Sequence, residues 1–319
     1  MPDTLQPINA LTVDVEDYFQ VSAFAQRINR HDWEKLDCRV ETNTDKLLSI
    51  FDRHEVRGTF FILGWIADRY PDLVKRIHLA GHEIASHGYW HQLVYDLKPE
   101  SFAEDLRSSR DAIANACGVE VTAYRAPSFS ITERSWWAME VLAENGFTTD
   151  SSVFPISGHD RYGVPNAKKE IHDIETSRGN IREFPPTAWH VGKFPVPVGG
   201  GYFRLFPLTL TSQAISAINR EGRPAMFYTH PWEFDPDQPR LSGLTRKTKF
   251  RHYVGLRRTG QRLSAMLGRH NFGTMSESME RYDASPANTN ETITLNPASQ
   301  PIIELLPITE SQTGSSSIS

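Results

Sequence analysis

The hydrophobic positions of this chain fall into short apolar runs separated by amphipathic segments. In segments such as 67–80 and 97–117, apolar side chains recur every three or four residues, which predicts helices. Strands and helices that alternate at this pitch form βα units around a parallel sheet, so the pattern predicts an α/β fold. The apolar runs that we expect to form its strands include 9–13, 58–63, 82–86, 121–124, 181–186 and 225–229.

Two stretches interrupt this alternation. Residues 153–182 are rich in loop-forming positions, and Pro195–Arg204 contains three consecutive glycines. The second stretch matches no phosphate-binding glycine motif, so we expect a loop whose glycines allow close backbone approach to a ligand.

The strand 82–86 leads into two histidines, His87 and His91. Side chains at positions i and i+4 can point the same way, so the two imidazoles can meet one metal ion. Two neutral imidazoles suit zinc, and a catalytic zinc site usually adds a third ligand, often a carboxylate. An HxxxH pair alone is common in proteins without a metal, but its position at a strand end favours a metal site.

The other predicted strands also end in polar side chains. The first strand carries Asp14, Glu16 and Asp17, three acids within four positions. Like charges this close repel unless a cation lies among them, which fits a metal with a basic residue nearby. Arg125 follows another strand, where it can hold a carboxylate with two parallel hydrogen bonds. Two further strand ends, after the runs at 147–149 and 225–229, carry Asp150 and His230.

Composition limits the classes of function. With 319 residues and 39% hydrophobic content, the chain can form one sizeable α/β domain with extensions, or two small domains. A net charge of -5 gives no field that would attract nucleic acid. We interpret the basic run Arg246–Arg251, with Arg257 and Arg258, as a solvated helix face; contact with an anionic polymer or a membrane surface is the alternative.

The same composition bears on location and order. No apolar run approaches the roughly 18 residues of a spanning helix, and two cysteines make no disulfide framework. We therefore expect a cytoplasmic protein without stable membrane insertion. From 284 to 319 the chain is rich in Ser, Thr, Asn and Pro, which predicts a low-complexity, disordered tail.

The order of these motifs resembles the polysaccharide deacetylases, the NodB-homology group also called carbohydrate esterase family four. The resemblance covers about residues 11–232, with an acid cluster, HxxxH, Arg-x-Pro, an aspartate and a late histidine. It implies a distorted (β/α)7 barrel, with a catalytic domain at 1–283 whose final part, 233–283, is a helical extension. The motifs closest to the subgroup of exosortase and exopolysaccharide loci are Asp14–Phe19, Thr59–Phe61, Gly81–His87 and Tyr228–Pro231.

The resemblance also implies a role for each motif residue. Either Glu16 or Asp17 would be the carboxylate ligand, because strand alternation puts Glu16 beside Asp14 whereas a turn beginning at Val15 would favour Asp17. The other implied roles are Asp14 as general base, His87 and His91 as metal ligands, Arg125 as the residue that orients the base, His230 as general acid, and Asp150 as the acid that tunes it.

The implied activity is hydrolysis of a carbon–nitrogen bond. The enzyme would use a divalent ion to remove acetyl groups, chiefly N-acetyl. We expect this ion to be Zn²⁺, with Co²⁺, Mn²⁺ or Ni²⁺ as alternatives. The substrate would be an acetylated polysaccharide or a lipid-linked sugar precursor in exopolysaccharide biosynthesis. Two alternatives are a non-catalytic carbohydrate-binding protein and a metal-dependent amidohydrolase of a small substrate. Aromatic residues that could stack on sugar rings or belong to the core are Trp189, Tyr202, Phe203 and Trp232.

Overall fold

The predicted strands pair into one largely parallel sheet in the computed structural model, which describes residues 6–159, 161–192, 194–285 and 292–294. The predicted α/β class is therefore confirmed. A short β11 (Phe272–Gly273) also pairs with β1, and β8 (Ala188–Val191) and β9 (Phe194–Pro197) form a separate hairpin. Along the sheet the strands follow the order β10 (Met226–Thr229), β1 (Asn9–Val15), β2 (Thr59–Ile62), β3 (Glu83–Ser86), β4 (Ala123–Tyr124), β5 (Thr149–Asp150), β7 (Gly179–Glu183), β6 (His172–Thr176) and β12 (Thr292–Thr294).

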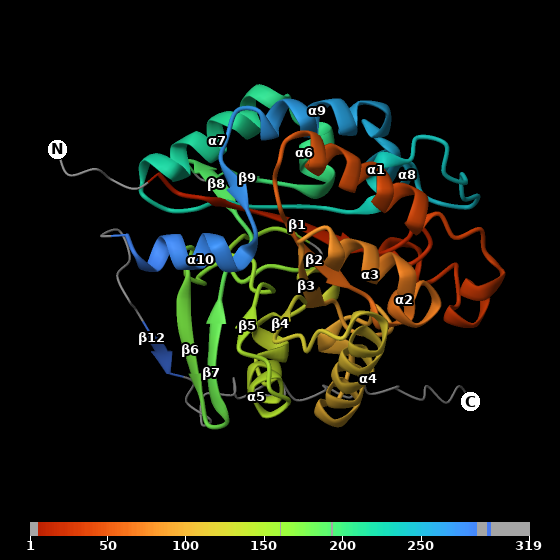
Figure 1. Ribbon diagram of the computed structural model, residues 1–319, viewed down its shortest axis with the longest axis horizontal. Coiled ribbons are helices and arrows are strands. Elements are labelled where there is room, and N and C mark those ends of the chain that lie inside the picture. Colours follow the sequence, from red (N-terminus) through yellow and green to blue (C-terminus); the bar gives the residue numbers. More distant parts are fainter. Residues whose placement is uncertain (1–5, 160, 193, 286–291, 295–319) are drawn as a thin grey trace, which may run out of the picture.

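Helices surround these strands, with α7 and α9 above β1 and β2, and α4 and α5 beside β4 and β5, in the view of Figure 1. Pro71 begins one helix and Pro99 another, because proline fits the first helical turn, where its missing N–H costs nothing. The helices are α1 (Val40–Arg53), α2 (Gly64–Arg69), α3 (Pro71–Leu79), α4 (Pro99–Cys117), α5 (Ala138–Glu144), α6 (Gly200–Leu205), α7 (Leu208–Arg220), α8 (Arg246–Tyr253), α9 (Thr259–Leu267) and α10 (Met275–Asp283).

The central strands are buried on both faces. All seven residues of β1 are buried, as are all four of β2 and of β10. Parallel strands covered on both sides carry continuous apolar runs rather than strict alternation, and this is the pattern that made them recognisable. The rigid centre of the sheet therefore positions the polar residues at its strand ends.

Two predictions of loop structure were wrong. Residues 172–176 form β6, which pairs antiparallel with β7 and alternates buried His172, Ile174 and Thr176 with more exposed neighbours. The glycine-rich stretch contains β9 and α6, and its glycines approach a side chain of the chain itself. A Cβ at Gly199 would lie 2.6 Å from Tyr228, so only glycine fits there.

The C-terminal extension is tied to the sheet, since β11 pairs with β1 and the Ser278 hydroxyl of α10 donates to the Ile8 carbonyl. In the predicted tail, Thr292–Thr294 pairs with β6, and most of the other residues lie outside the described part of the chain. Among the described strands, the sheet begins at β10 and ends at β12, and these two end strands do not pair with each other. Closure of the sheet into a barrel therefore stays a prediction. No helix in the described residues combines the length and apolar character needed to cross a membrane.

A core substitution should show how strongly the sheet depends on β2. Phe60 is fully buried, whereas Leu79 is 74% exposed. We expect Phe60→Ala to lower the free energy of unfolding by about 3–5 kcal/mol, because it leaves a cavity between sheet and helices. Leu79→Ala, the matched control, should change it by less than about 0.5 kcal/mol. Urea unfolding followed by circular dichroism measures both, and equal effects would contradict the packing described.

Candidate metal and acid–base site

The polar strand ends meet at one edge of the sheet. Asp14 lies in β1, His87 directly follows β3, Arg125 follows β4 and His230 follows β10. These strands run parallel, so their carboxyl ends face the same way. The arrangement brings together residues that are more than 200 positions apart in the sequence.

Glu16, His87 and His91 form a buried cluster whose ligand atoms all lie within 4.8 Å of one another. Glu16 Oε2 is 2.6 Å from His91 Nε2. The carbonyl of Arg125 accepts a hydrogen bond from His87 Nδ1 at 2.8 Å, which leaves Nε2 of that imidazole to face the cluster. Two imidazoles and a carboxylate, with ring orientation fixed by a carbonyl, are the donor set of catalytic zinc sites.

The residues fit a divalent cation. Glu16 Oε2 is buried without a hydrogen bond in the described structure, although His91 lies so close. Burial by itself would raise the Glu16 pKa, but the His91 imidazole, with His230 and His87, outweighs it and lowers that pKa. Burial lowers the pKa of His87 to about 4, so this imidazole is neutral and can bind a metal.

Of the two candidate carboxylates, Glu16 joins the imidazoles and Asp17 does not. Asp17 accepts hydrogen bonds from the backbone N–H groups of Tyr18 and Arg39, which orders the loop after β1. The turn at this strand end carries Asp17 away from the cluster. Burial raises the pKa of Asp17 to about 6.

Arg125 is fully buried and holds Asp14. Its Nη1 donates to Asp14 Oδ1 at 2.7 Å and to the Thr12 hydroxyl at 2.8 Å. Its Nε and Nη2 donate to the carbonyl and hydroxyl of Ser151. With its donors occupied, the guanidinium fixes the position of the Asp14 carboxylate.

His230 faces the same two carboxylates. Its Nε2 lies 3.8 Å from Asp14 Oδ2 and 3.7 Å from Glu16 Oε1. Burial lowers the pKa of His230, but Glu233, Glu16 and Asp14 together raise it to about 9, so the imidazole holds a proton at neutral pH. The site thus places an arginine-bound carboxylate and a protonated imidazole beside a candidate metal position.

Comparison with known families agrees with this arrangement. Residues 33–148 match the family model for polysaccharide deacetylase, and residues 151–280 match a domain of unknown function, DUF3473. The region 33–148 is therefore similar to the NodB-type polysaccharide deacetylases. Among related proteins is a peptidoglycan-N-acetylglucosamine deacetylase of Bacillus cereus, 31% identical over 98 residues, which are 30% of this chain and 36% of that protein.

A second relative is a chitooligosaccharide deacetylase of Rhizobium leguminosarum bv. trifolii, 32% identical over 74 residues, 23% of this chain and 34% of that protein. The chain thus spans about a third of the length of these curated relatives. A solved structure from Mycobacterium smegmatis, assigned as a polysaccharide deacetylase, has the same fold. It aligns with a TM-score of 0.57 at 22% identity, over 89% of this chain and 92% of that chain.

No contact between Asp150 and the late histidine is found among the described residues, so the role expected for Asp150 stays a prediction. The pairing of β5 with β7 places Asp150 opposite Glu183, and both carboxyls are fully buried. Asp150 accepts from the hydroxyl and the N–H of Ser152. Burial raises the pKa of both acids, and the charge of Asp150 raises that of Glu183 further, so the pair holds a proton.

The carboxylate that contacts His230 belongs to Glu233. Its Oε2 lies 3.4 Å from His230 Nδ1 and accepts from the Thr229 hydroxyl, while Arg204 Nε donates to Oε1 at 2.7 Å. Burial raises the pKa of Glu233, but Arg204 and His230 lower it to about 2. Glu233 comes three residues after His230, a spacing that allows this contact within one short 3₁₀ turn.

Trp232 also belongs to the site rather than to an exposed sugar platform. Its indole N–H donates to Glu16 Oε1 at 3.0 Å, and only 6% of the residue is exposed. Phe203 is buried as well, so two of the four aromatics considered for stacking are not exposed to a sugar. No pattern in the sequence indicates the contact between Trp232 and Glu16, which lie 216 residues apart.

The two acids after β1 should differ in metal binding. We expect Glu16→Gln to weaken zinc binding at least about tenfold, because it removes the only carboxylate among the three clustered donors. Asp17→Asn should retain zinc, since its amide oxygen can still accept from the backbone. Zinc content after dialysis measures both. Metal loss in Asp17→Asn with retention in Glu16→Gln would assign the ligand to the other acid.

The buried acid pair should make stability fall as pH rises. The folded pair keeps a proton that free carboxyls, with pKa values of 3.8 and 4.5, release. Stability is therefore complete below about pH 4 and is lost as pH rises through the folded pKa. We expect Glu183→Gln to reduce the loss between pH 5 and 8 by about 1–2 kcal/mol. Urea unfolding at several pH values measures this, and parallel curves for the two proteins would contradict it.

Proposed function

We propose that this chain is a metal-dependent deacetylase that hydrolyses acetyl groups, chiefly N-acetyl, on a carbohydrate. The observation that supports this most directly is the position of Glu16, His87 and His91 beside two acid–base groups of opposite kind. These groups are Asp14, held by Arg125, and protonated His230, whose Nε2 lies 3.8 Å from Asp14 Oδ2 and 3.7 Å from Glu16 Oε1. Amide hydrolysis needs both, because a proton must leave the attacking water and another must reach the departing amine.

Glu16, His87 and His91 are the residues that would hold the ion, and we propose Zn²⁺ for it. When bound, a divalent ion of this kind lowers the pKa of water to about 7 and polarises the acetyl carbonyl. Cobalt, manganese and nickel accept the same donors and remain alternatives. Trp232 and the Arg125 carbonyl orient two of the ligands.

Asp14 accepts the proton of the attacking water in this proposal. Arg125 occupies Oδ1, so Oδ2 is the oxygen that faces the site. His230 donates its proton to the nitrogen of the leaving amine as the carbon–nitrogen bond breaks, and Glu233 orients the ring from behind. The products are acetate and a free amino sugar. Asp14 gains one proton from water and His230 gives one to the amine, so the number of protons is conserved.

The substrate is proposed from the relatives, whose names specify peptidoglycan and chitooligosaccharides. Trp90 directly precedes His91 and is 37% exposed, so its ring is available to stack on a sugar. We further propose a polysaccharide or lipid-linked precursor in cytoplasmic exopolysaccharide biosynthesis, as in the exosortase-associated subgroup. A binding protein without catalysis is less favoured, since the side chains proposed as acid, base and metal ligands lie close together.

One experiment separates these functions. Zinc-loaded protein is incubated with N-acetylated and O-acetylated oligosaccharides, and with small amides, while acetate or amine release is measured. Release from sugars supports the proposal, and the preferred substrate identifies the bond. Sugar binding without release, at full zinc occupancy, would make the chain a binding protein. Hydrolysis of small amides alone would make it an amidohydrolase.

Asp14→Asn should separate chemistry from metal binding. The amide keeps the shape of the side chain but cannot accept a proton, so we expect kcat to fall about 10²- to 10⁴-fold with zinc content unchanged. Steady-state kinetics and metal analysis on the same preparation measure both. Undiminished kcat at equal zinc content would exclude Asp14 as the base.

His230→Ala should affect poor leaving groups most. We expect kcat on an N-acetyl sugar to fall at least about 10²-fold, because an amine must be protonated to depart. An aryl acetate ester, whose phenolate leaves without a proton, should lose much less. Similar losses on both substrates would contradict an acid role and would indicate a general disturbance of the site.

A further inference from the structure

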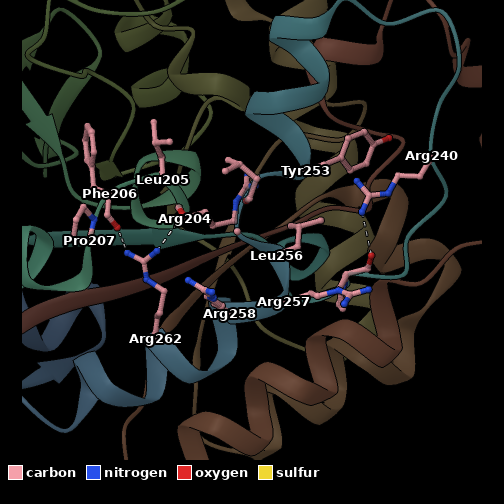
Figure 2. Close-up of a pocket in the computed structure, with 13 residues that line it drawn as sticks. Arg204, Leu205, Phe206, Pro207, Arg240, Tyr253, Leu256, Arg257, Arg258 and Arg262 are labelled. Carbon is pink, nitrogen blue, oxygen red and sulfur yellow. Dashed lines mark hydrogen bonds between the residues drawn. The ribbon is translucent and has the colours of Figure 1, made fainter.

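A cavity of about 690 Å³ lies apart from the residues of the metal site. It is formed by the end of α6, the segment after the 3₁₀ turn at Pro231–Phe234, and the chain between α8 and α9. Figure 2 shows Arg258 and Arg262 on one side of it and Arg240 and Arg257 on the other. Two residues of the basic run predicted to form a solvated helix face, Arg257 and Arg258, therefore line a cavity.

The charges around this cavity are almost all of one sign. Five arginines line it and no acidic residue does. Only one of the five, Arg204, has a carboxylate partner in the described structure, namely Glu233. The other N–H groups of Arg204 donate to the carbonyls of Arg251, His252 and Val254, so they are not available to a ligand in the cavity. The remaining arginines leave uncompensated positive charge there.

Those four guanidinium groups differ in how free they are. Arg262 donates to the carbonyls of Arg204 and Phe206, which holds it against the wall. Arg240 lies over the Tyr253 ring, 4.1 Å from its centre. Arg257 and Arg258 are exposed and make no side-chain hydrogen bond or ion pair in the part of the chain described. Two fixed and two available guanidinium groups thus surround one space.

This concentration of charge has a physical cost without a ligand. Burial lowers the pKa of Arg262, and the nearby positive charge of Arg258 lowers it further. Arginines on an ordinary surface separate or pair with acids. Here the backbone carbonyls and the Tyr253 ring hold Arg262 and Arg240 in place, so the positive field persists and would be relieved by an anion.

A second, less polar cavity of about 560 Å³ adjoins the first and shares Arg240, Tyr253 and Val254 with it. Its wall includes Lys249 and Phe250, and Phe250 is 56% exposed. If the charged group of a ligand occupied the first cavity, an uncharged part of the same ligand could lie in the second.

We propose that this arginine-lined cavity binds a phosphate or diphosphate group carried by a larger ligand. Guanidinium groups match phosphate oxygens with paired hydrogen bonds, and phosphate carries more charge and more acceptor oxygens than a carboxylate. The site is independent of the metal site and of acetate release. The phosphate group could belong to a soluble sugar or to a lipid, and in both cases the cavity would bind the same anionic group.

The test uses the full chain and inorganic pyrophosphate as probe, with isothermal titration at low salt. We expect saturable binding to the unaltered protein and an affinity at least about tenfold lower in an Arg257→Gln/Arg258→Gln double variant. The matched control, Arg246→Gln/Lys247→Gln, removes the same charge from exposed positions of α8 outside both cavities, and should stay within about twofold. Circular dichroism and zinc content establish that each variant is folded.

No saturable binding by the unaltered protein would overturn the proposal, as would equal losses in both double variants, because general charge would then explain the binding. Tighter binding of citrate than of pyrophosphate would overturn the choice of phosphate. Two further probes identify the bearer. Soluble sugar diphosphate binding that depends on Arg257 and Arg258 supports a soluble ligand, whereas Arg-dependent sedimentation with phosphatidic acid vesicles, at equal salt, supports a lipid phosphate.

Discussion

The buried ion pair between Arg125 and Asp14 is the interaction on which the site depends. Arg125 follows β4 and Asp14 lies in β1, with β2 and β3 between them in the sheet. Strands are spaced roughly 4.8 Å apart, so a flat sheet would separate the two by roughly 14 Å. The long Arg125 side chain crosses most of this separation, and its 2.7 Å contact with Asp14 ties the two strand ends together across β2 and β3. A fully buried guanidinium also needs this partner, because an unpaired charge there would be costly.

The site joins the two parts of the chain that match different family models. His87 and His91 come from the region 33–148, and His230, Trp232 and Glu233 come from the region 151–280, whereas Asp14 and Glu16 precede both regions. Trp232 holds the Glu16 carboxylate, and Arg204 holds Glu233. One continuous sheet carries β1 and both matched regions, so neither region contains all of the candidate acid, base and metal ligands.

Acidic residues at the strand ends have three different fates, decided by their neighbours. Glu16 lies among imidazoles, which lower its pKa, and Asp17 accepts from backbone amides. Asp150 faces Glu183, so those two acids share a proton. Chemically similar side chains thus become a candidate ligand, a loop anchor and a structural pair. The basic cavity beside α8 lies apart from this acidic centre.

The sequence by itself determined the α/β class and most members of the site. Buried parallel strands are apolar throughout and end in polar residues, so Asp14, His87, His91, Arg125 and His230 could be found from strand ends alone. Only the tertiary structure showed that Glu16, and not Asp17, lies beside the two imidazoles. It also showed that Asp150 lies opposite Glu183 and that Glu233 contacts His230. Those outcomes depend on the turn after β1 and on the register of β5 with β7, which bring distant residues into contact through packing that local pattern does not encode.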